Sequence, residues 1–276
     1  MFEKIIGHDN QKVILHDDVK NNKVSHAYLF VGSKGVGKYQ VAKEFAKEIL
    51  KTDSLDTCAD YKYITKREDK KDIIVEQIRK DVIDDIYLAP VSGEKKVYII
   101  DDAEYLNPAS QNTLLKTLEE PPKYVVIILI SSSTSSFLPT IISRVNIMNF
   151  SNIENEKLDK YIKEKYNVTF DKNILSFIDG SLGQAINIIN NNLLDEFNNI
   201  NKVFEYIKVK DVVSAFKLLE SIKFNDNILD YLEYLLYTNS LILCTKFVEK
   251  AKNRLKMNGN YDIVIDNMIL NIIDNI

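Results

Sequence analysis

Apolar residues in the first 150 positions fall into short runs that are separated by amphipathic segments. The runs that have the length and composition of strands are residues 26–31, 60–64, 96–101, 125–130 and 145–150, of which 60–64 is the weakest. The runs at 97–100 and 125–130 are apolar at every position, which is typical of central strands covered by helices on both faces. Strands that alternate with helices predict an α/β domain around a mainly parallel sheet over residues 1–150.

The segment NPASQNTLLKTLEEPP carries clear signals for a helix. Asn107 can cap its N-terminus, Pro108 suits its first turn, and the two prolines that follow EE end it. Its apolar stripe consists of Leu114, Leu115 and Leu118. The pattern therefore predicts a helix between the strand at 96–101 and the strand at 125–130.

Strand patterns end at about residue 150. Three segments with helical period, at 154–166, 172–180 and 181–191, predict a small helical unit over residues 151–193. Four further helical segments predict an all-α bundle over residues 194–276. We therefore expect domains at 1–150, 151–193 and 194–276.

Composition limits the cellular locations and the kinds of partner and metal site that are expected for the chain. No apolar run approaches the length of a membrane span, and the first residues, MFEKIIGHDNQK, lack the features of a secretory signal. Cys58 and Cys244 have neither zinc-ligand spacing nor the pattern of a disulfide framework. The net charge of −4 argues against bulk electrostatic coating of nucleic acid. The sequence thus predicts a soluble cytoplasmic protein without zinc and without membrane contact.

Residues 32–39, GSKGVGKY, fit the phosphate-binding pattern G-x-x-x-x-G-K-[ST] except at the last position. Gly32, Gly35 and Gly37 allow backbone N–H groups to close around an anion, and Lys38 would reach the β and γ phosphates. Tyr39 stands where a Ser or Thr hydroxyl would bind magnesium. The loop follows a predicted strand and opens a predicted helix, which favours a nucleotide site over a plain glycine turn.

Two acids, Asp101 and Asp102, follow the buried strand at 96–101. A P-loop protein places there the acid that holds magnesium and the acid that activates water. Asp101 would take the first role and Asp102 the second. Taken alone, such a pair is also common as an ordinary helix cap.

The strand at 125–130 runs into SSSTSS, which offers hydroxyl groups near a γ-phosphate, and Arg144 follows in the segment FLPTIISR. The chain has only four arginines among 36 basic residues. An arginine suits a developing phosphoryl charge because its planar guanidinium is always charged. Arg144 could serve a site in its own subunit or in a neighbour, or could be a structural arginine at a helix end.

The segments SHAYLFVGSKGVGK, VYIIDDAE, NTLLKTLEEPP and LPTIISR, in this order, resemble the clamp-loader branch of the AAA+ proteins. Within that branch they are most similar to the delta prime subunits of bacterial DNA polymerase III. The resemblance covers residues 5–190. It implies an AAA+ domain at 1–150, a helical lid at 151–193 and a collar domain for oligomerisation at 194–276.

The resemblance also implies partners and a role. These are the other clamp-loader subunits, of gamma/tau and delta type, in a ring that opens a sliding clamp and places it on primed DNA. Arg144 matches the arginine of the family's SRC motif, which reaches into the ATP site of the adjacent subunit, and Val145 replaces the cysteine. Ile5, Ile6 and His8 match the segment that borders the adenine, although the same residues could equally be part of the core.

Three departures from the family pattern indicate weak or absent ATP hydrolysis. Tyr39 lacks the magnesium-binding hydroxyl, Asp102 replaces a catalytic glutamate, and Gln184 replaces a sensor arginine. We therefore expect a stator subunit that can still bind ATP or ADP, with doubtful Mg²⁺ binding. The alternative is an autonomous or motor-type P-loop ATPase of the clamp-loader or helicase-loader group.

Overall fold

The computed structural model describes residues 2–3, 5–67 and 69–276, which form two compact units. The first unit extends to Tyr161 and also includes Gly180–Gly183; the second comprises Ile162–Asp179 and Gln184–Ile276. The segment 151–193, expected to be a lid, is shared between the units. The expected division into three domains stays a prediction.

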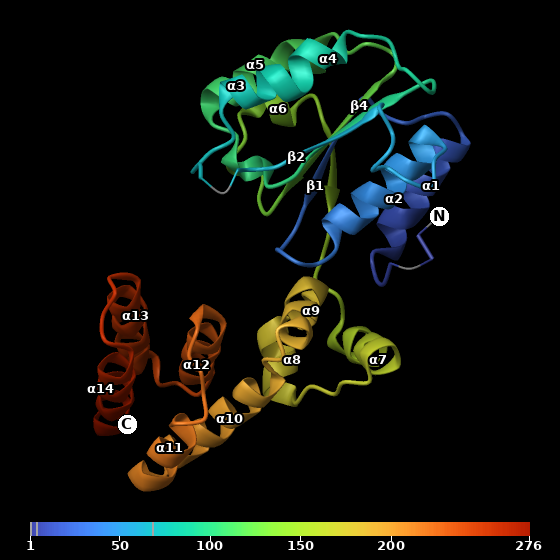
Figure 1. Ribbon diagram of the computed structural model, residues 1–276. Coiled ribbons are helices and arrows are strands. Elements are labelled where there is room, and N and C mark those ends of the chain that lie inside the picture. The colour runs from blue at the N-terminus through green and yellow to red at the C-terminus, as the bar shows by residue number, and fades with distance from the viewer. Residues whose placement is uncertain (1, 4, 68) are drawn as a thin grey trace. The chain divides into compact units, whose positions relative to one another are not determined.

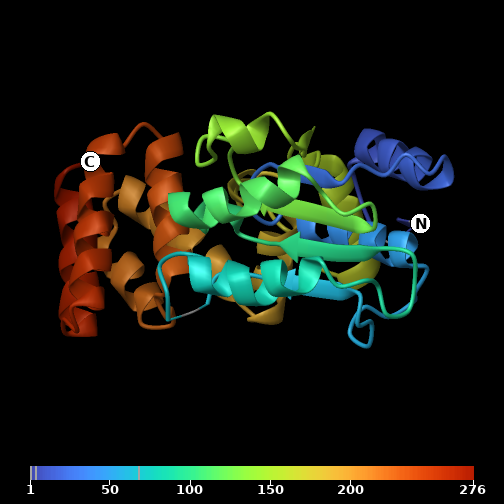
Figure 2. The ribbon, with the colours of Figure 1, turned by 90° about the horizontal axis from the view of Figure 1, so that it is seen from above.

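The first unit is built on a parallel five-stranded sheet in the order β2-β3-β4-β1-β5 (Figures 1 and 2). The strands are β1 (Ala27–Val31), β2 (Tyr61–Ile64), β3 (Lys96–Ile100), β4 (Val125–Ser131) and β5 (Asn146–Asn149). Every residue of β3 and β4 is buried, which confirms that they are central strands. All five strands were expected from the sequence, including the weak one.

Helices cover both faces of this sheet. In Figure 1, two helices coloured blue lie on one side of the strands, and helices coloured cyan and green lie on the other. The blue helices are α1 (Asp9–Lys20) and α2 (Lys38–Leu50). The others are α3 (Val75–Ile78), the π-helix Arg79–Ile83, α4 (Asp84–Ile86), α5 (Pro108–Glu119) and α6 (Pro139–Ile142), with a 3-10 turn at Ala103–Tyr105. Alternate strand residues enter one or the other of two apolar cores, as the pleat of a strand requires.

Helix α5 begins and ends where the sequence predicts. The side chain of Asn107 accepts a hydrogen bond from Ser110 N at 2.9 Å, and Pro108 is the first helical residue. The leucine stripe packs inward, with Leu114 and Leu118 buried. Buried Gln111 also donates to Ser136 O and accepts from Leu138 N, so that α5 fixes the start of α6.

The second unit is helical. Helix α7 (Asn155–Tyr166) crosses from the first unit into it, and α9 (Leu182–Asn190) crosses the second boundary. The others are α8 (Lys172–Ile178), α10 (Leu194–Lys208), α11 (Val212–Leu219), α12 (Asp226–Thr238), α13 (Ile242–Lys256) and α14 (Tyr261–Asp274). An aromatic cluster of Phe177, Phe197 and Tyr231 joins α8, α10 and α12. Within the ranges that the structure describes, no helix is long and apolar enough to cross a membrane.

Candidate functional site

The loop at 32–37 has the strand–loop–helix setting that the sequence predicts. It follows β1 directly, and Gly37 is the residue before the first turn of α2, with φ 107°. Gly35 also lies in the left-handed region, at φ 78°. These conformations are costly for residues with a Cβ, so the glycines are needed for the shape of the loop.

A second segment, from Ser181 to Gly183, lies directly on this loop. Gly183 N donates to Gly35 O at 2.8 Å, and Ser181 Oγ donates to Lys34 O at 3.1 Å. A Cβ on Gly35 would lie 2.1 Å from Ser181 Oγ. This contact was not predicted from the sequence, in which the glycine pair of GSLG is its one signal.

Lys38 is turned back onto its own loop. Its Nζ donates to Gly32 O and, at 2.8 Å, to Ser33 O, and only 7% of the residue is exposed. Burial lowers the pKa of Lys38, and the nearby Glu104 and Asp101 oppose this shift. A phosphate that binds Lys38 must therefore replace two carbonyl acceptors.

The acid pair lies at the same edge of the sheet as the loop, because both follow parallel strands. Asp101 Oδ1 accepts from Asp102 N at 2.9 Å, and Asp101 Oδ2 accepts from the Tyr63 hydroxyl at 3.1 Å. Burial raises the pKa of Asp101. The ring of Tyr63 packs on that of Tyr39, with 5.0 Å between ring centroids. Both oxygens of the acid expected to hold magnesium thus already accept hydrogen bonds.

The residues present do not fit a magnesium ion. Mg²⁺ requires oxygen ligands in nearly ideal octahedral geometry. Tyr39 supplies no hydroxyl at the usual position, and Tyr63 already engages Asp101. Lys34 Nζ lies 3.8 Å from Asp102 Oδ1. Lys34 thus supplies positive charge beside Asp102.

The serine-rich segment after β4 reaches the same edge, since β4 lies between β3 and β1. Ser132 Oγ donates to Glu104 Oε1 at 2.8 Å, which links this segment to the turn after the acid pair. His8 lies on the other flank, with its Nε2 2.7 Å from Val36 O in the loop. A cleft of about 280 Å³ beside His8 is bordered by residues 7–11 and 151–154. It lies next to the segment expected to border an adenine.

Arg144 lies just after α6 and before β5, and about one third of its side chain is exposed. Its Nη1 donates to Thr140 O at 2.8 Å and to Ser143 Oγ at 3.1 Å. Its Nη2 lies 2.9 Å from Glu119 Oε1, at the end of α5. The sequence did not single out Glu119, which is one of two adjacent acids in EEPP.

Arg144 and the loop lie at opposite edges of the sheet. The loop follows the carboxyl end of β1, whereas Arg144 precedes the amino end of β5, and these strands pair in parallel with Tyr28 opposite Asn146. A strand of five residues is about 17 Å long, which is more than an arginine side chain spans. Arg144 therefore does not reach the phosphate loop of its own chain.

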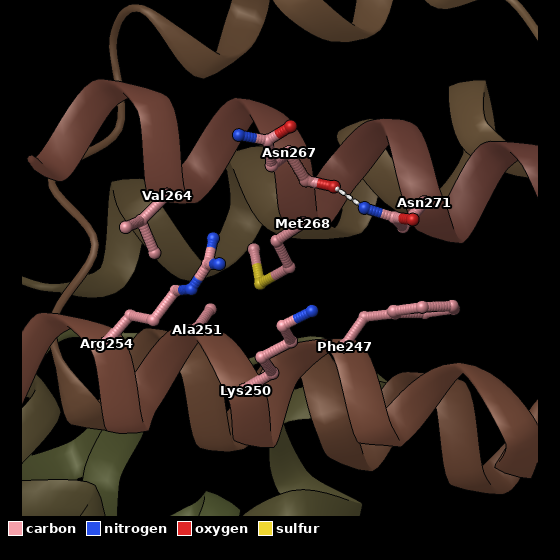
Figure 3. A pocket seen from close by; sticks show the side chains of 8 residues that line it. All are labelled: Phe247, Lys250, Ala251, Arg254, Val264, Asn267, Met268 and Asn271. Carbon is pink, nitrogen blue, oxygen red and sulfur yellow. Dashed lines mark hydrogen bonds between the residues drawn. The ribbon is translucent and has the colours of Figure 1, made fainter. Parts of the chain in front are cut away.

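Gln184 directly follows Gly183 and belongs to the second unit. Its role as the replacement of a sensor arginine stays a prediction. The second unit has a groove of its own, of about 360 Å³, between α13 and α14 (Figure 3). Lys250 and Arg254 line it from α13, and Asn267 and Asn271 from α14, over a floor that includes Met268. No sequence signal indicated this groove.

Comparison with known proteins identifies relatives. The family model described as DNA polymerase III, delta subunit, matches residues 7–154. The DNA polymerase III subunit gamma of Buchnera aphidicola is 27% identical over 247 residues, which are 82% of this chain and 68% of that protein. The subunit tau of Bacillus subtilis is 31% identical over 230 residues, or 77% of this chain and 40% of that protein. The chain thus spans about two thirds of one relative and less than half of the other.

A solved structure supports the fold. A DNA polymerase III gamma subunit-related protein from Thermotoga maritima superposes with a TM-score of 0.62 at 17% identity. The match covers 95% of this chain and 99% of that one. At this identity the likeness concerns the fold alone.

Proposed function

This chain belongs to the DNA polymerase III, delta subunit family of clamp-loader proteins related to gamma and tau, and from that premise we propose that it is a subunit of the delta prime type. In this role it is the stator of a clamp loader and helps to place the sliding clamp on primed DNA in the cytoplasm. Its partners are subunits of gamma/tau and delta type. It hydrolyses little or no ATP itself.

The observation that carries this proposal is the position of Arg144. The side chain is partly exposed at the amino edge of the sheet, whereas the phosphate loop lies at the carboxyl edge. If Arg144 contacts a nucleotide, that nucleotide is held by another subunit, because the side chain cannot reach its own loop. We therefore assign Arg144 to the stabilisation of phosphoryl charge in a neighbour's ATP site.

The loop of this chain has a different role in the proposal. Its glycine backbone can still cradle phosphates, so ATP or ADP can bind there. Asp101 and Tyr39 provide no fitting magnesium site, and Asp102 is shorter than the glutamate of hydrolysing relatives. Bound nucleotide would then stabilise the subunit without being consumed.

Reconstitution with the gamma/tau-type and delta-type subunits tests the proposal. We expect Arg144→Ala to reduce ATP turnover by about 10³-fold at the interface that receives this arginine. Arg79→Ala is the matched control, because Arg79 is exposed in the same unit and lies in the π-helix before α4. Unchanged turnover in the Arg144 variant would refute the assignment.

The second candidate is an autonomous or motor-type ATPase. It is favoured by the intact strand–loop–helix geometry and by the identity to gamma and tau subunits. The isolated chain separates the two functions, because an autonomous ATPase hydrolyses ATP without partner subunits. Sustained turnover that is abolished by Lys38→Ala would establish the second candidate.

A further inference from the structure

Helix α5 ends in two adjacent acids that have different surroundings. Glu119 is its last residue and Glu120 follows as the C-cap. Negative charge is unfavourable at this end of a helix, where the macrodipole is itself negative. Glu119 is paired with Arg144 at 2.9 Å, whereas the Glu120 side chain is exposed and makes no hydrogen bond or ion pair with the part of the chain that the structure describes. The pairing is therefore specific to one of two otherwise similar acids.

The two ends of the Arg144 guanidinium are held by different elements. Nη1 donates to Thr140 O and Ser143 Oγ, which both belong to α6 and its cap, and these bonds orient the side chain. Nη2 is engaged by Glu119, from α5. A phosphate binds a guanidinium best through two parallel N–H···O bonds. Both hydrogens of Nη1 are used on α6, so a phosphate that leaves this anchor in place must bind Nη2 and Nε, and Arg144 must release Glu119 from Nη2 first.

The surroundings of the pair allow such an exchange. Arg144 and Glu119 border an open cleft of about 570 Å³, together with Ser25, His26 and Asn146. The side chains of the pair are 33% and 48% exposed. Exposed ion pairs contribute little to stability. Glu119 can therefore hold the guanidinium in the free subunit and still be displaced by a more highly charged anion.

We propose that Glu119 is a releasable counter-ion that masks Arg144 in the free subunit and yields it to a terminal phosphate of the neighbour's nucleotide. The mask rests on the proposed function only for the identity of the phosphate. The pairing and its release are properties of this chain. Glu119 is thus a regulatory residue, because it competes with the phosphate and touches no reacting atom.

The isolated full-length chain tests the mask directly. Phenylglyoxal modifies free guanidinium groups, and the modification of Arg144 is followed by peptide mass spectrometry. We expect Glu119→Gln to increase the modification rate of Arg144 by up to about fivefold, the range of an exposed ion pair. Glu120→Gln removes the same charge one residue away and should leave the rate unchanged.

Salt provides a second arm of the same test. Screening weakens exposed ion pairs, so added NaCl should accelerate modification of Arg144 in the wild-type chain. The acceleration should be much smaller in Glu119→Gln. Equal rates for wild type and Glu119→Gln, at both low and high salt, would overturn the proposal.

The reconstituted assembly tests the competition with phosphate. The ATP concentration that gives half-maximal turnover should fall by up to about fivefold with Glu119→Gln, and it should stay unchanged with Glu120→Gln. A higher half-maximal concentration in Glu119→Gln would mean that Glu119 positions Arg144 and does not mask it. If the wild-type assembly shows no turnover dependent on Arg144, the proposed function fails, while the modification rates still decide whether the mask exists.

Discussion

Tyr63 competes for the carboxylate of Asp101, the acid that was expected to hold magnesium. Its hydroxyl donates to Asp101 Oδ2, and its ring rests on Tyr39, which itself replaces the metal-binding hydroxyl of the loop. Burial raises the pKa of Tyr63, and the neighbouring Asp101 adds to this shift, so the hydroxyl stays a donor at neutral pH. The two tyrosines together explain at the level of single atoms why the site does not fit magnesium.

Replacing both tyrosines should create a magnesium dependence that the wild-type chain lacks. In the variant Tyr39→Thr/Tyr63→Phe, the loop regains a hydroxyl and Asp101 loses a hydrogen bond that competes with the metal. We expect Mg²⁺ to strengthen the binding of ADP by about tenfold, because a hydrogen bond to a charged group contributes roughly 1.5 kcal/mol or more.

Calorimetric titration with ADP, in Mg²⁺ and in EDTA, measures this effect. Tyr87→Phe is the control, since Tyr87 is half exposed and lies away from the loop in sequence. Tight binding by the wild-type chain that EDTA abolishes would contradict the role given to the tyrosines.

At the scale of elements, Asp85 joins α4 to the sheet. Its Oδ2 accepts from the Tyr98 hydroxyl at 2.6 Å and lies 3.1 Å from Nζ of buried Lys96, both on β3. Partial burial pushes the pKa of Asp85 up, but the bonds from Tyr98 and Lys96, with Lys62 nearby, hold it below its ordinary value. The carboxylate therefore stabilises the folded state.

Removing this charge should destabilise the first unit. We expect Asp85→Asn to reduce the free energy of unfolding by about 2 kcal/mol at pH 7, because Lys96 loses its charged partner. Asp84→Asn is the control, as Asp84 is exposed and adjacent. Urea titrations of both variants provide the comparison.

The pH dependence follows from the lowered pKa of Asp85. The contribution of Asp85 to the free energy of unfolding is complete above the ordinary aspartate pKa of about 3.9. It is lost as the pH falls through the lower pKa that Asp85 has in the folded state. The difference in the free energy of unfolding between wild type and Asp85→Asn should therefore be constant between about pH 5 and about pH 8. It should shrink below about pH 4. A difference that grows on acidification would show that another group is responsible.

The strands and α5 could be predicted from the sequence because the signals that define them, apolar runs and capping residues, lie within each segment. Asn107 caps α5 through Ser110, and β3 and β4 are buried along their whole length. The break between α12 and α13 is less visible in the sequence. It lies at Ser240, a residue with φ 63° inside an otherwise apolar, helical pattern.

At the scale of the whole molecule, the sequence could predict which residues gather at the carboxyl edge but not what covers them. Parallel order brings Lys38, Asp101 and the serine segment to one edge once the strands are known. The contact of Gly35 with Gly183 joins residues far apart in the chain and has no local signature. The hydrogen bond from Tyr63 to Asp101 also has no local signature, because it depends on the pairing of β2 with β3.

Gly35→Ala tests how strongly the segment 181–183 holds the loop. The new Cβ would meet Ser181 Oγ, and a left-handed backbone costs an alanine about 1 to 2 kcal/mol. We expect amide hydrogen exchange at Gly183 to become faster, since this N–H donates to Gly35 O. Gly93→Ala is the control, because a Cβ there meets nothing. Slower or equal exchange at Gly183 would mean that the loop does not depend on this contact.

The contact between Gly35 and Gly183 also has a consequence for folding during synthesis, because its two residues are made at different times. All five strands have been made once Asn149 leaves the ribosome, but the segment that closes the phosphate loop follows more than thirty residues later. Domains generally fold as units, and the bonds of the loop to Ser181 and Gly183 cannot form until these residues have been made. The phosphate loop, although encoded near the start of the chain, is thus among the last parts of the first unit to reach its final form.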